Sequence, residues 1–345
     1  MSNSAGVQAT LSNAARTLLG AAAFMKNGRT PPFAYQSMLQ LFCATGGASN
    51  DAMSSLLSLA KRPYALPDRR GVLGDLSSED VDAIGSDLRQ RGYHVFNQRL
   101  SDDLCDRLLE FATSTPCVRR GMDGEVNADE DVSHFPRQRP EGIRYDFSEQ
   151  TLIDNPLVQK LMADRSIISV AQNYLRAQPI VDVVAMWWNT ASARPDKQAA
   201  QFWHFDMDRI KWLKFFIYLT DVGPENGPHS FVEGSHRTGG ISRSLLHKGY
   251  SRLTDEEVNS NYPAERFVEF TAPRGTILAE DTRGLHKGKH VTSGDRLMLQ
   301  LQFSNSLFGG DYPMSGITRF LDPSLEDMIL KHPRIYSNYT GRSAK

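Results

Sequence analysis

Residues 296–303 carry the strictest pattern in the chain, Arg-Leu-Met-Leu-Gln-Leu-Gln-Phe. Successive side chains of a β-strand point to opposite faces of its sheet, so the leucines and Phe303 fall on one face. The opposite face carries Arg296, Met298, Gln300 and Gln302. One face suits an apolar core between packed layers, and the other can line a solvated funnel. The run therefore restricts this part of the chain to a sheet that packs on one side and borders a site on the other.

A second pattern places metal-binding side chains at two distant positions. Residues 203–208 are Trp-His-Phe-Asp-Met-Asp, and His286 follows in Asp281-Thr-Arg-Gly-Leu-His-Lys-Gly288. His204 and Asp206 are two apart, so on a strand their side chains emerge on the same face. The long interval to His286 leaves room for several antiparallel strands that return it to the other two. Two imidazoles and one carboxylate bind Fe(II) on one face of an octahedron, so the sequence predicts a mononuclear iron site.

An isolated His-x-Asp tripeptide is weak evidence, because it occurs by chance and an ordinary core or surface histidine is the simpler explanation. Its surroundings strengthen the prediction. The pair precedes an apolar run, Lys211-Trp-Leu-Lys-Phe-Phe-Ile-Tyr-Leu219, and then the turn residues Gly223-Pro-Glu-Asn-Gly-Pro228. A strand followed by such a turn predicts a β-hairpin within one sheet.

Two segments that contain these residues resemble a known family. They are WHFDMDRIKWLKFFIYLTDVGPENGPHSFVEGSH (203–236) and GTILAEDTRGLHKGKHVTSGDRLMLQLQFSNS (275–306). Together they are similar to the phytanoyl-CoA dioxygenase family of Fe(II)/2-oxoglutarate-dependent oxygenases, and the likeness extends from about Ser77 to Gly310. The resemblance implies a mainly β protein with flanking helices around a double-stranded β-helix, a cupin-like jelly roll. It also implies iron ligands and a cosubstrate anchor, which are His204, Asp206, His286 and, for 2-oxoglutarate, Arg296.

The resemblance further implies a reaction that consumes O₂ and 2-oxoglutarate and releases succinate and CO₂. The expected product is a hydroxylated C–H bond of a small-molecule or carrier-bound acyl substrate. Desaturation, epoxidation or ring formation would use the same metal site, whereas halogenation is disfavoured because Asp206 fills the position that a halide needs. The alternative from another class of protein is a noncatalytic jelly-roll binding module. The presence of suitable residues at all four functional positions counts against this alternative.

Strand phase gives further candidates for binding cosubstrate or substrate. If Phe216 faces inward, Lys214 and Tyr218 share its face, although a lysine more often lies on a solvated face. Arg296 offers a planar fork that matches a carboxylate, and a lysine cannot reproduce it. Further polar candidates for the pocket are Asn189, Gln201 and Gln300. Asp208 could steady Arg209 or a metal ligand, and the alternative is an exposed side chain.

The remaining histidines are expected to have ordinary roles. His236 lies in the turn segment Glu233-Gly-Ser-His236 and is predicted to be structural. His290 follows Gly288 and precedes Val-Thr-Ser-Gly, which favours a loop over a metal-binding helix face. No spacing implicates His94, His134, His229, His247 or His332.

Composition favours an enzyme of the reducing cytoplasm. The chain has 345 residues, a formal net charge of −1 and three cysteines at positions 43, 105 and 117. Such a charge gives no reason to expect nucleic acid, and the cysteines have no metal-type spacing. No apolar stretch approaches the ~20 residues of a membrane span. We expect a helical N-terminal extension over 1–70, which docks or self-associates, and an oxygenase domain over 71–345.

Within the expected domain, Ser77-Ser-Glu-Asp-Val predicts a capped helix that continues to Arg91. A strand over 92–96, a helix over 101–112, a helix near 156–175 and a strand over 180–188 should follow. Residues 118–150 are polar and predict a long loop. This segment and residues 237–265 are expected to be lids over the site.

Overall fold

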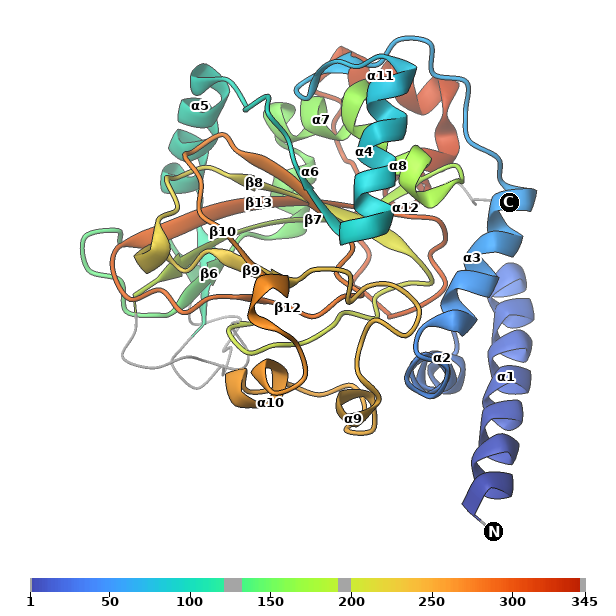
Figure 1. Cartoon of the computed structure of the whole chain (residues 1–345). Coiled ribbons are helices and arrows are strands. Elements are labelled where there is room, and N and C mark those ends of the chain that lie inside the picture. The colour runs from blue at the N-terminus through green and yellow to red at the C-terminus, as the bar shows by residue number, and fades with distance from the viewer. Residues whose placement is uncertain (1, 121–131, 192–199, 342–345) are drawn as a thin grey trace.

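The computed structural model describes residues 2–120, 132–191 and 200–341, and it contains two facing antiparallel sheets with helices around them (Figure 1). The strands are β1 (Arg70–Gly71), β2 (Gly74–Asp75), β3 (Tyr93–Val95), β4 (Cys117–Arg120), β5 (Val132–Ser133), β6 (Arg144–Asp146), β7 (Ile180–Thr190), β8 (Trp212–Tyr218), β9 (His229–Val232), β10 (Phe267–Phe270), β11 (Ile277–Glu280), β12 (His286–Gly288) and β13 (Asp295–Ser304). The helices are α1 (Ser2–Asn27), α2 (Pro32–Thr45), α3 (Ala48–Ala60), α4 (Ser78–Arg91), α5 (Asp102–Ser114), α6 (Glu149–Ile153), α7 (Pro156–Met162), α8 (Arg165–Leu175), α9 (Arg243–Leu246), α10 (Asp255–Asn259), α11 (Pro323–Lys331) and α12 (Ser337–Thr340), with short 3₁₀ turns η1 (Pro224–Asn226), η2 (Ala264–Arg266) and η3 (Pro333–Tyr336).

The strand order confirms the predicted double-stranded β-helix. The larger sheet has the order β3-β11-β8-β13-β7-β6-β4-β5, and the smaller sheet has the order β10-β9-β12. A bridge between His204 and His286 adds the His204 segment beside β12. Along the chain, β7, the His204 segment, β8 and β9 lie alternately in the larger and the smaller sheet, and so do β10, β11, β12 and β13. Crossing between two sheets in this way produces a jelly roll, which leaves a space between them.

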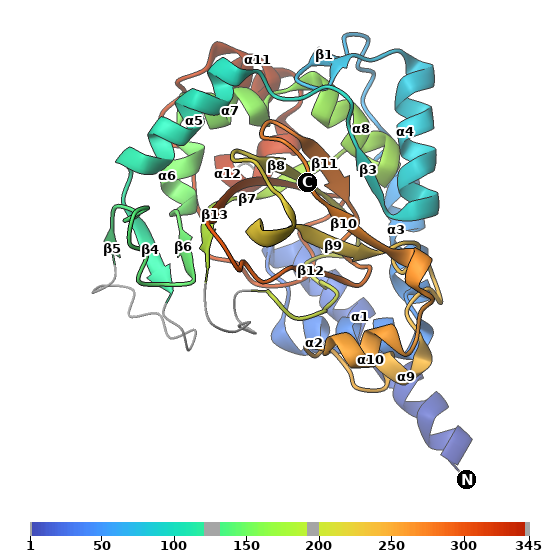
Figure 2. The same ribbon diagram turned by 60° about the vertical axis from the view of Figure 1, so that its left-hand side comes forward.

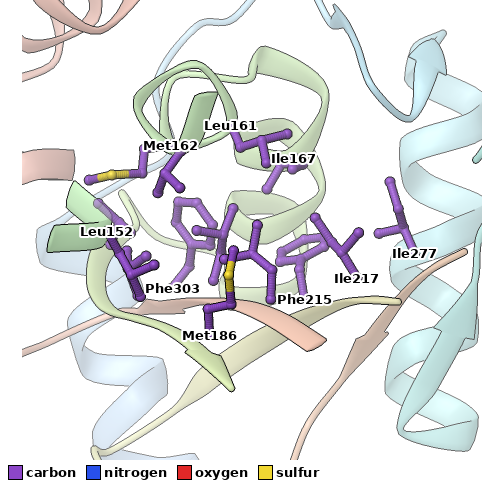
Figure 3. Packing of buried hydrophobic residues seen from close by; sticks show 14 of the residues in the cluster. Leu152, Leu161, Met162, Ile167, Met186, Phe215, Ile217, Ile277 and Phe303 are labelled. Carbon is purple, nitrogen blue, oxygen red and sulfur yellow. The ribbon is translucent and has the colours of Figure 1, made fainter. Parts of the chain in front are cut away.

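The alternation in β13 divides its side chains between two environments, as the sequence predicts. Its leucines and Phe303 enter an apolar cluster that fills the space between the larger sheet and helices α4 to α8 (Figure 3). In the neighbouring strand β8, Phe215 and Ile217 join the same cluster, whereas Phe216 and Tyr218 face the space between the sheets. The helices therefore seal one face of the sheet, and the site is confined to the other face.

Capping residues predict correctly where helices α4 and α5 begin. Ser77 caps α4 through a capping box, in which the Ser77 hydroxyl accepts from the Asp80 amide and the Asp80 carboxylate accepts from the Ser77 amide. Ser101 caps α5. The single helix expected over 156–175 is two helices, α7 and α8. Asp164 is the N-cap of α8, and its side chain accepts a hydrogen bond from the Ile167 amide.

Two other expectations are wrong. Strand β8 does not form a hairpin with β9: it pairs with β11 and β13, and the turn at 223–228 carries the chain across to the smaller sheet. A turn motif indicates a change of direction and does not specify which strand becomes the partner. The segment 118–150 contains β5 and β6 in the larger sheet where a loop was expected, because pairing with β4 and β7 satisfies its backbone groups. Residues 121–131 lie outside the described part of the chain.

The N-terminal helices α1 to α3 lie beside the sheets and pack against them (Figures 1 and 2). Gly28, Gly46 and Gly47 adopt positive φ angles between α1 and α2 and between α2 and α3, where one helix ends and the next begins. In α3, the buried Asn50 amide donates to the Ile210 carbonyl at 3.0 Å. Docking of this segment is therefore observed, while its separate domain status stays a prediction.

Among residues 2–120, 132–191 and 200–341, no helix has the length and apolarity required to cross a bilayer. All three cysteines, Cys43, Cys105 and Cys117, are free thiols.

Candidate metal centre

Three side chains from the smaller sheet converge as the sequence predicts. His204, Asp206 and His286 each offer one ligand atom, and these atoms all lie within 4.8 Å of one another. His204 Nε2 is 3.7 Å from Asp206 Oδ1, and His286 Nε2 is 3.4 Å from Asp206 Oδ2. Backbone pairing sets this geometry, because the His204 and His286 amides and carbonyls exchange hydrogen bonds of 3.0 and 2.8 Å. A cluster of two imidazoles and one carboxylate matches the donor set that Fe(II) takes in oxygenases.

The backbone also fixes which nitrogen each histidine presents. His204 Nδ1 lies 2.8 Å from the Phe202 carbonyl, and His286 Nδ1 lies 3.0 Å from the Gly284 carbonyl. A carbonyl can only accept, so each Nδ1 carries a proton, and in its neutral form each ring would present the Nε2 lone pair to a metal. Both Nε2 atoms point toward Asp206, and such outer hydrogen bonds orient metal ligands.

Lys214 contacts the ligand carboxylate and is not solvated. Its ammonium lies 2.6 Å from Asp206 Oδ2 and 3.1 Å from Asp208 Oδ2. Burial alone would raise the pKa of Asp206, but Lys214 and then His286 outweigh burial and hold that pKa well below its usual range. Burial alone would lower the pKa of Lys214, but Asp206 and Asp208 outweigh burial and raise it. Asp206 is therefore ionised and positioned, as metal binding requires.

Arg296 is a buried cation without a counterion among the described residues. Its side chain is 3% exposed, and its Nη2 donates to the neutral Asn189 Oδ1 at 2.8 Å. The Nε and Nη1 groups have no partner in the described part of the chain. Burial lowers the pKa of Arg296 to about 10, which leaves it charged at neutral pH. Gly288 permits close approach here, because a Cβ on it would lie 3.2 Å from Arg296 Nη2.

A cavity of ≈ 310 Å³ joins the metal cluster to Arg296. Lys214 and Gln300, two of the predicted pocket residues, line it, and so does Asp208. Asn189 lies behind Arg296 and holds it. Tyr218 does not line the cavity; its hydroxyl accepts from the His229 amide at 3.2 Å. Gln201 is buried outside the lining, and the cofactor-binding roles of all these residues stay predictions.

His229 has a place at the site that its position in the sequence does not indicate. Its ring lies 5.5 Å from the His286 ring and 4.9 Å from the Phe216 ring. Its Nε2 is 3.0 Å from the carboxyl group of the buried Glu280. Burial lowers the pKa of His229 and raises the pKa of Glu280 to about 8, so a neutral pair supports the site from behind. The expectation of an ordinary role for His229 was therefore wrong, and only the pairing of β9 with β12 reveals it.

Other residues missed in the sequence reach the cavity from distant segments. Arg144 lines it from β6, where it is paired with Asp146 at 2.7 Å and lies over the Trp187 ring. Arg252 and Tyr312 also line it, and the Tyr312 hydroxyl donates to Asp208 at 2.6 Å. No residue spacing could have indicated Arg144, Arg252 and Tyr312, because they lie far apart in the chain and only folding brings them to one cavity.

The N-terminal extension supports the metal-ligand segment from outside. Phe205, which lies between the two ligands, stacks on Phe42 of α2 with ring centroids 5.3 Å apart. Both rings are buried. Because Phe205 points away from the ligand face, its packing fixes the orientation of the ligand segment.

The other predicted histidines behave as expected. His236 is buried outside the metal cluster, with Nε2 3.2 Å from the Arg89 carbonyl, in keeping with a structural role. His290 lies outside any helix and is not part of the cluster.

Comparison with known proteins gives one family match and several matches to solved structures. The phytanoyl-CoA dioxygenase (PhyH) family model matches residues 88–298, and no curated protein matches the chain. HygX from Streptomyces hygroscopicus with nickel and 2-oxoglutarate bound is 16% identical, with a TM-score of 0.47, over 66% of this chain and 87% of that chain. EctD from S. alaskensis with 2-oxoglutarate and 5-hydroxyectoine is 20% identical, with a TM-score of 0.46, over 71% and 85%. The carbocyclase SnoK from nogalamycin biosynthesis is 19% identical, with a TM-score of 0.45, over 66% and 84%.

Proposed function

Because the chain belongs to the phytanoyl-CoA dioxygenase family of Fe(II)/2-oxoglutarate-dependent oxygenases, we propose that it hydroxylates an unactivated C–H bond of a small-molecule or acyl substrate. In this proposal His204, Asp206 and His286 hold the iron, and Arg296 holds the distal carboxylate of 2-oxoglutarate. Succinate and CO₂ are released with the oxidised product.

The observation that carries the proposal is the unpaired guanidinium of Arg296 beside the three metal-binding side chains. A buried charge without a partner is costly, so such a group is retained where a ligand supplies the opposite charge. Two of its nitrogens have no partner in the described part of the chain. A carboxylate accepts two parallel N–H bonds from such a fork, which suits a dicarboxylate cosubstrate.

The residues of the chain position and shield the reaction. Bound iron would supply the activation of O₂ that is coupled to decarboxylation of 2-oxoglutarate. Phe216, Trp187 and Met298 give the cavity an apolar wall, which excludes water from part of the site. Lys214 keeps Asp206 ionised and oriented. The ≈ 310 Å³ cavity suits 2-oxoglutarate together with a small substrate or the reacting end of a longer acyl chain.

The proposal is tested by metal and cosubstrate binding in purified protein. Iron(II) and 2-oxoglutarate added without oxygen should give a visible metal-to-ligand absorption band, and oxygen should then release succinate. His204→Ala, Asp206→Ala and His286→Ala should each lose the band and the succinate, while His247→Ala, at an exposed histidine, should keep both. No band and no succinate from the unmodified protein would favour the noncatalytic binding module. Full turnover by His286→Ala would show that the third ligand is another residue.

The substrate and the reaction outcome need a separate experiment. A metabolite comparison between a deletion strain and its parent should reveal pairs that differ by the mass of one oxygen atom. Pairs that differ by two hydrogens would indicate desaturation or ring formation at the same site instead.

We also propose that the protein is cytoplasmic, which its three free thiols support. A further proposal is that the chain self-associates through its N-terminal extension. Large apolar side chains remain exposed along α1, and they are Val7, Leu11, Leu18, Leu19 and Met25. Light scattering should give a multiple of the 38.6 kDa chain mass, and Leu11→Glu with Leu18→Glu should restore the single-chain mass.

A further inference from the structure

A second cavity, of ≈ 280 Å³, lies where α3 meets the core, and it shares no lining residue with the metal cavity. We call it the basic pocket. Its wall contains five cationic side chains, which are Arg89, Arg176, Lys211, Arg237 and Arg283. The lining comes from α3, the end of α4, the end of α8 and the segments around 211, 237 and 283, so both the extension and the core contribute to it.

Only one of the five cations is neutralised by carboxylates among the described residues. Arg283 donates to Asp281 at 2.7 Å and to Asp51 at 2.9 Å. Arg89 donates to the neutral Asn173 side chain, and Arg237 to the Gly234 carbonyl. Neither of these arginines, nor Arg176 or Lys211, forms an ion pair within residues 2–120, 132–191 and 200–341. The basic pocket therefore holds an excess of positive charge.

Lys211 is the most confined of the unpaired cations. Its ammonium lies 4.4 Å from the centre of the buried Tyr174 ring and makes no hydrogen bond to a described residue. Burial, and after it the nearby Arg283, lower the pKa of Lys211 to about 8, although Asp281 and Asp51 oppose this shift. Burial and Arg176 likewise lower the pKa of Arg89. The cations thus destabilise one another, and a bound anion would relieve this repulsion.

We propose that the basic pocket binds a phosphate group. Four unpaired cations in a concave wall match a dianion with several acceptor oxygens better than a single carboxylate. The ≈ 280 Å³ volume admits a phosphate with a small attached group and not a nucleic-acid strand. A phosphate here would contact α3 and α8 together, and so would join the extension to the core.

Calorimetry at low ionic strength tests the proposal with two probes, inorganic phosphate and glycerol 3-phosphate. Both titrations use the full chain without added metal, so the result is independent of the oxygenase chemistry. We expect binding in the micromolar to low millimolar range that weakens as salt is added. Tighter binding of glycerol 3-phosphate would assign the site to the phosphate of a larger molecule, and tighter binding of inorganic phosphate would assign it to the free ion.

Two variants and one control locate the binding. Lys211→Gln removes the confined cation, and Arg176→Asn removes an exposed one at a left-handed position that asparagine tolerates. Each should weaken phosphate binding at least tenfold, while Lys160→Gln, at an exposed lysine of α7 outside the pocket, should leave it unchanged. If neither probe binds the unmodified chain at 10 mM, or if both variants bind phosphate as it does, the proposal is wrong.

Discussion

Arg296 offers the sharpest test at the scale of single residues. Arg296→Lys keeps the charge but loses the two-pronged donor, so one point contact would hold the distal carboxylate of 2-oxoglutarate. Losing a bidentate, charge-assisted pair costs on the order of 1.5–3 kcal/mol, or roughly 10- to 150-fold in cosubstrate affinity. Anaerobic titration of the absorption band with 2-oxoglutarate measures this loss.

The control is iron affinity, which should survive because Arg296 is not a ligand. If 2-oxoglutarate binds Arg296→Lys and Arg296→Ala as tightly as the unmodified protein, another cation is the anchor. Lys214, a predicted candidate for binding cosubstrate, already contacts Asp206 and Asp208. Arg144, which also lines the cavity, would then be the next candidate to substitute.

His236 gives the protein a predictable response to pH. Burial lowers the pKa of His236 to about 4 from an ordinary value of 6.5. Between these values the unfolded chain binds the proton more readily than the folded chain, so acid favours unfolding. The stability that neutral His236 contributes is fully present above about pH 6.5 and is lost as the pH falls toward 4.

His236→Gln should remove this response. Between pH 7 and pH 5, its free energy of unfolding should fall by roughly 2 kcal/mol less than that of the unmodified protein. Urea unfolding at the two pH values measures both changes. Equal decreases in the free energy of unfolding of the two proteins would mean that His236 takes up a proton as readily in the folded chain as in the unfolded chain.

At the scale of elements, residues 237–265 keep the predicted role of a lid. The segment contains the short helices α9 and α10 and the start of η2. Within it, Arg252 lines the metal cavity and Leu253 pairs with Trp203 beside the first ligand. We expect hydrogen exchange in 237–265 to slow when iron(II) and 2-oxoglutarate bind without oxygen, and to slow further with substrate. Peptides from α11, which lies among the outer helices, serve as the control. Unchanged exchange in 237–265 under both conditions would count against a lid.

The second expected lid, residues 118–150, includes segments that belong to the larger sheet. Strands β5 and β6 fix residues 132–133 and 144–146 in the larger sheet, and Arg144 reaches the cavity from there. This part forms a wall of the site and cannot move as a loop without breaking strand pairs.

At the scale of the whole molecule, we predict that the extension and the β-helix unfold as one cooperative unit. Phe42 stacks on Phe205, and Asp51 pairs with Arg283, so α2 and α3 bury surface that the core would otherwise expose. All four tryptophans, at positions 187, 188, 203 and 212, lie outside the extension, so their fluorescence reports mainly on the β-helix, although Trp203 shares an apolar cluster with α2. Far-ultraviolet circular dichroism also reports on α1 to α3. The two signals should give coincident urea transitions, and an earlier loss of dichroism would show that the extension unfolds separately.

The sequence by itself determined which face each side chain of β13 takes and which three side chains are candidate metal ligands. The alternation of side chains along a strand depends only on local backbone geometry. The apolar and polar side chains of β13 therefore lie on opposite faces of the sheet, as its sequence predicts. His204, Asp206 and His286 could be chosen because few residue types bind Fe(II), and the structure brings their ligand atoms together, while their role as iron ligands stays a prediction.

Tertiary structure alone decided which groups share the site. Strand partners far apart in the chain place His229 beside Glu280 and carry β8 away from β9. Burial and neighbouring charges, which no single segment contains, turn Lys214 toward Asp206 and leave Arg296 without a counterion among the described residues. Local patterns encode the direction and face of a side chain, whereas its charge partners and its exposure to water depend on which distant segments pack around it.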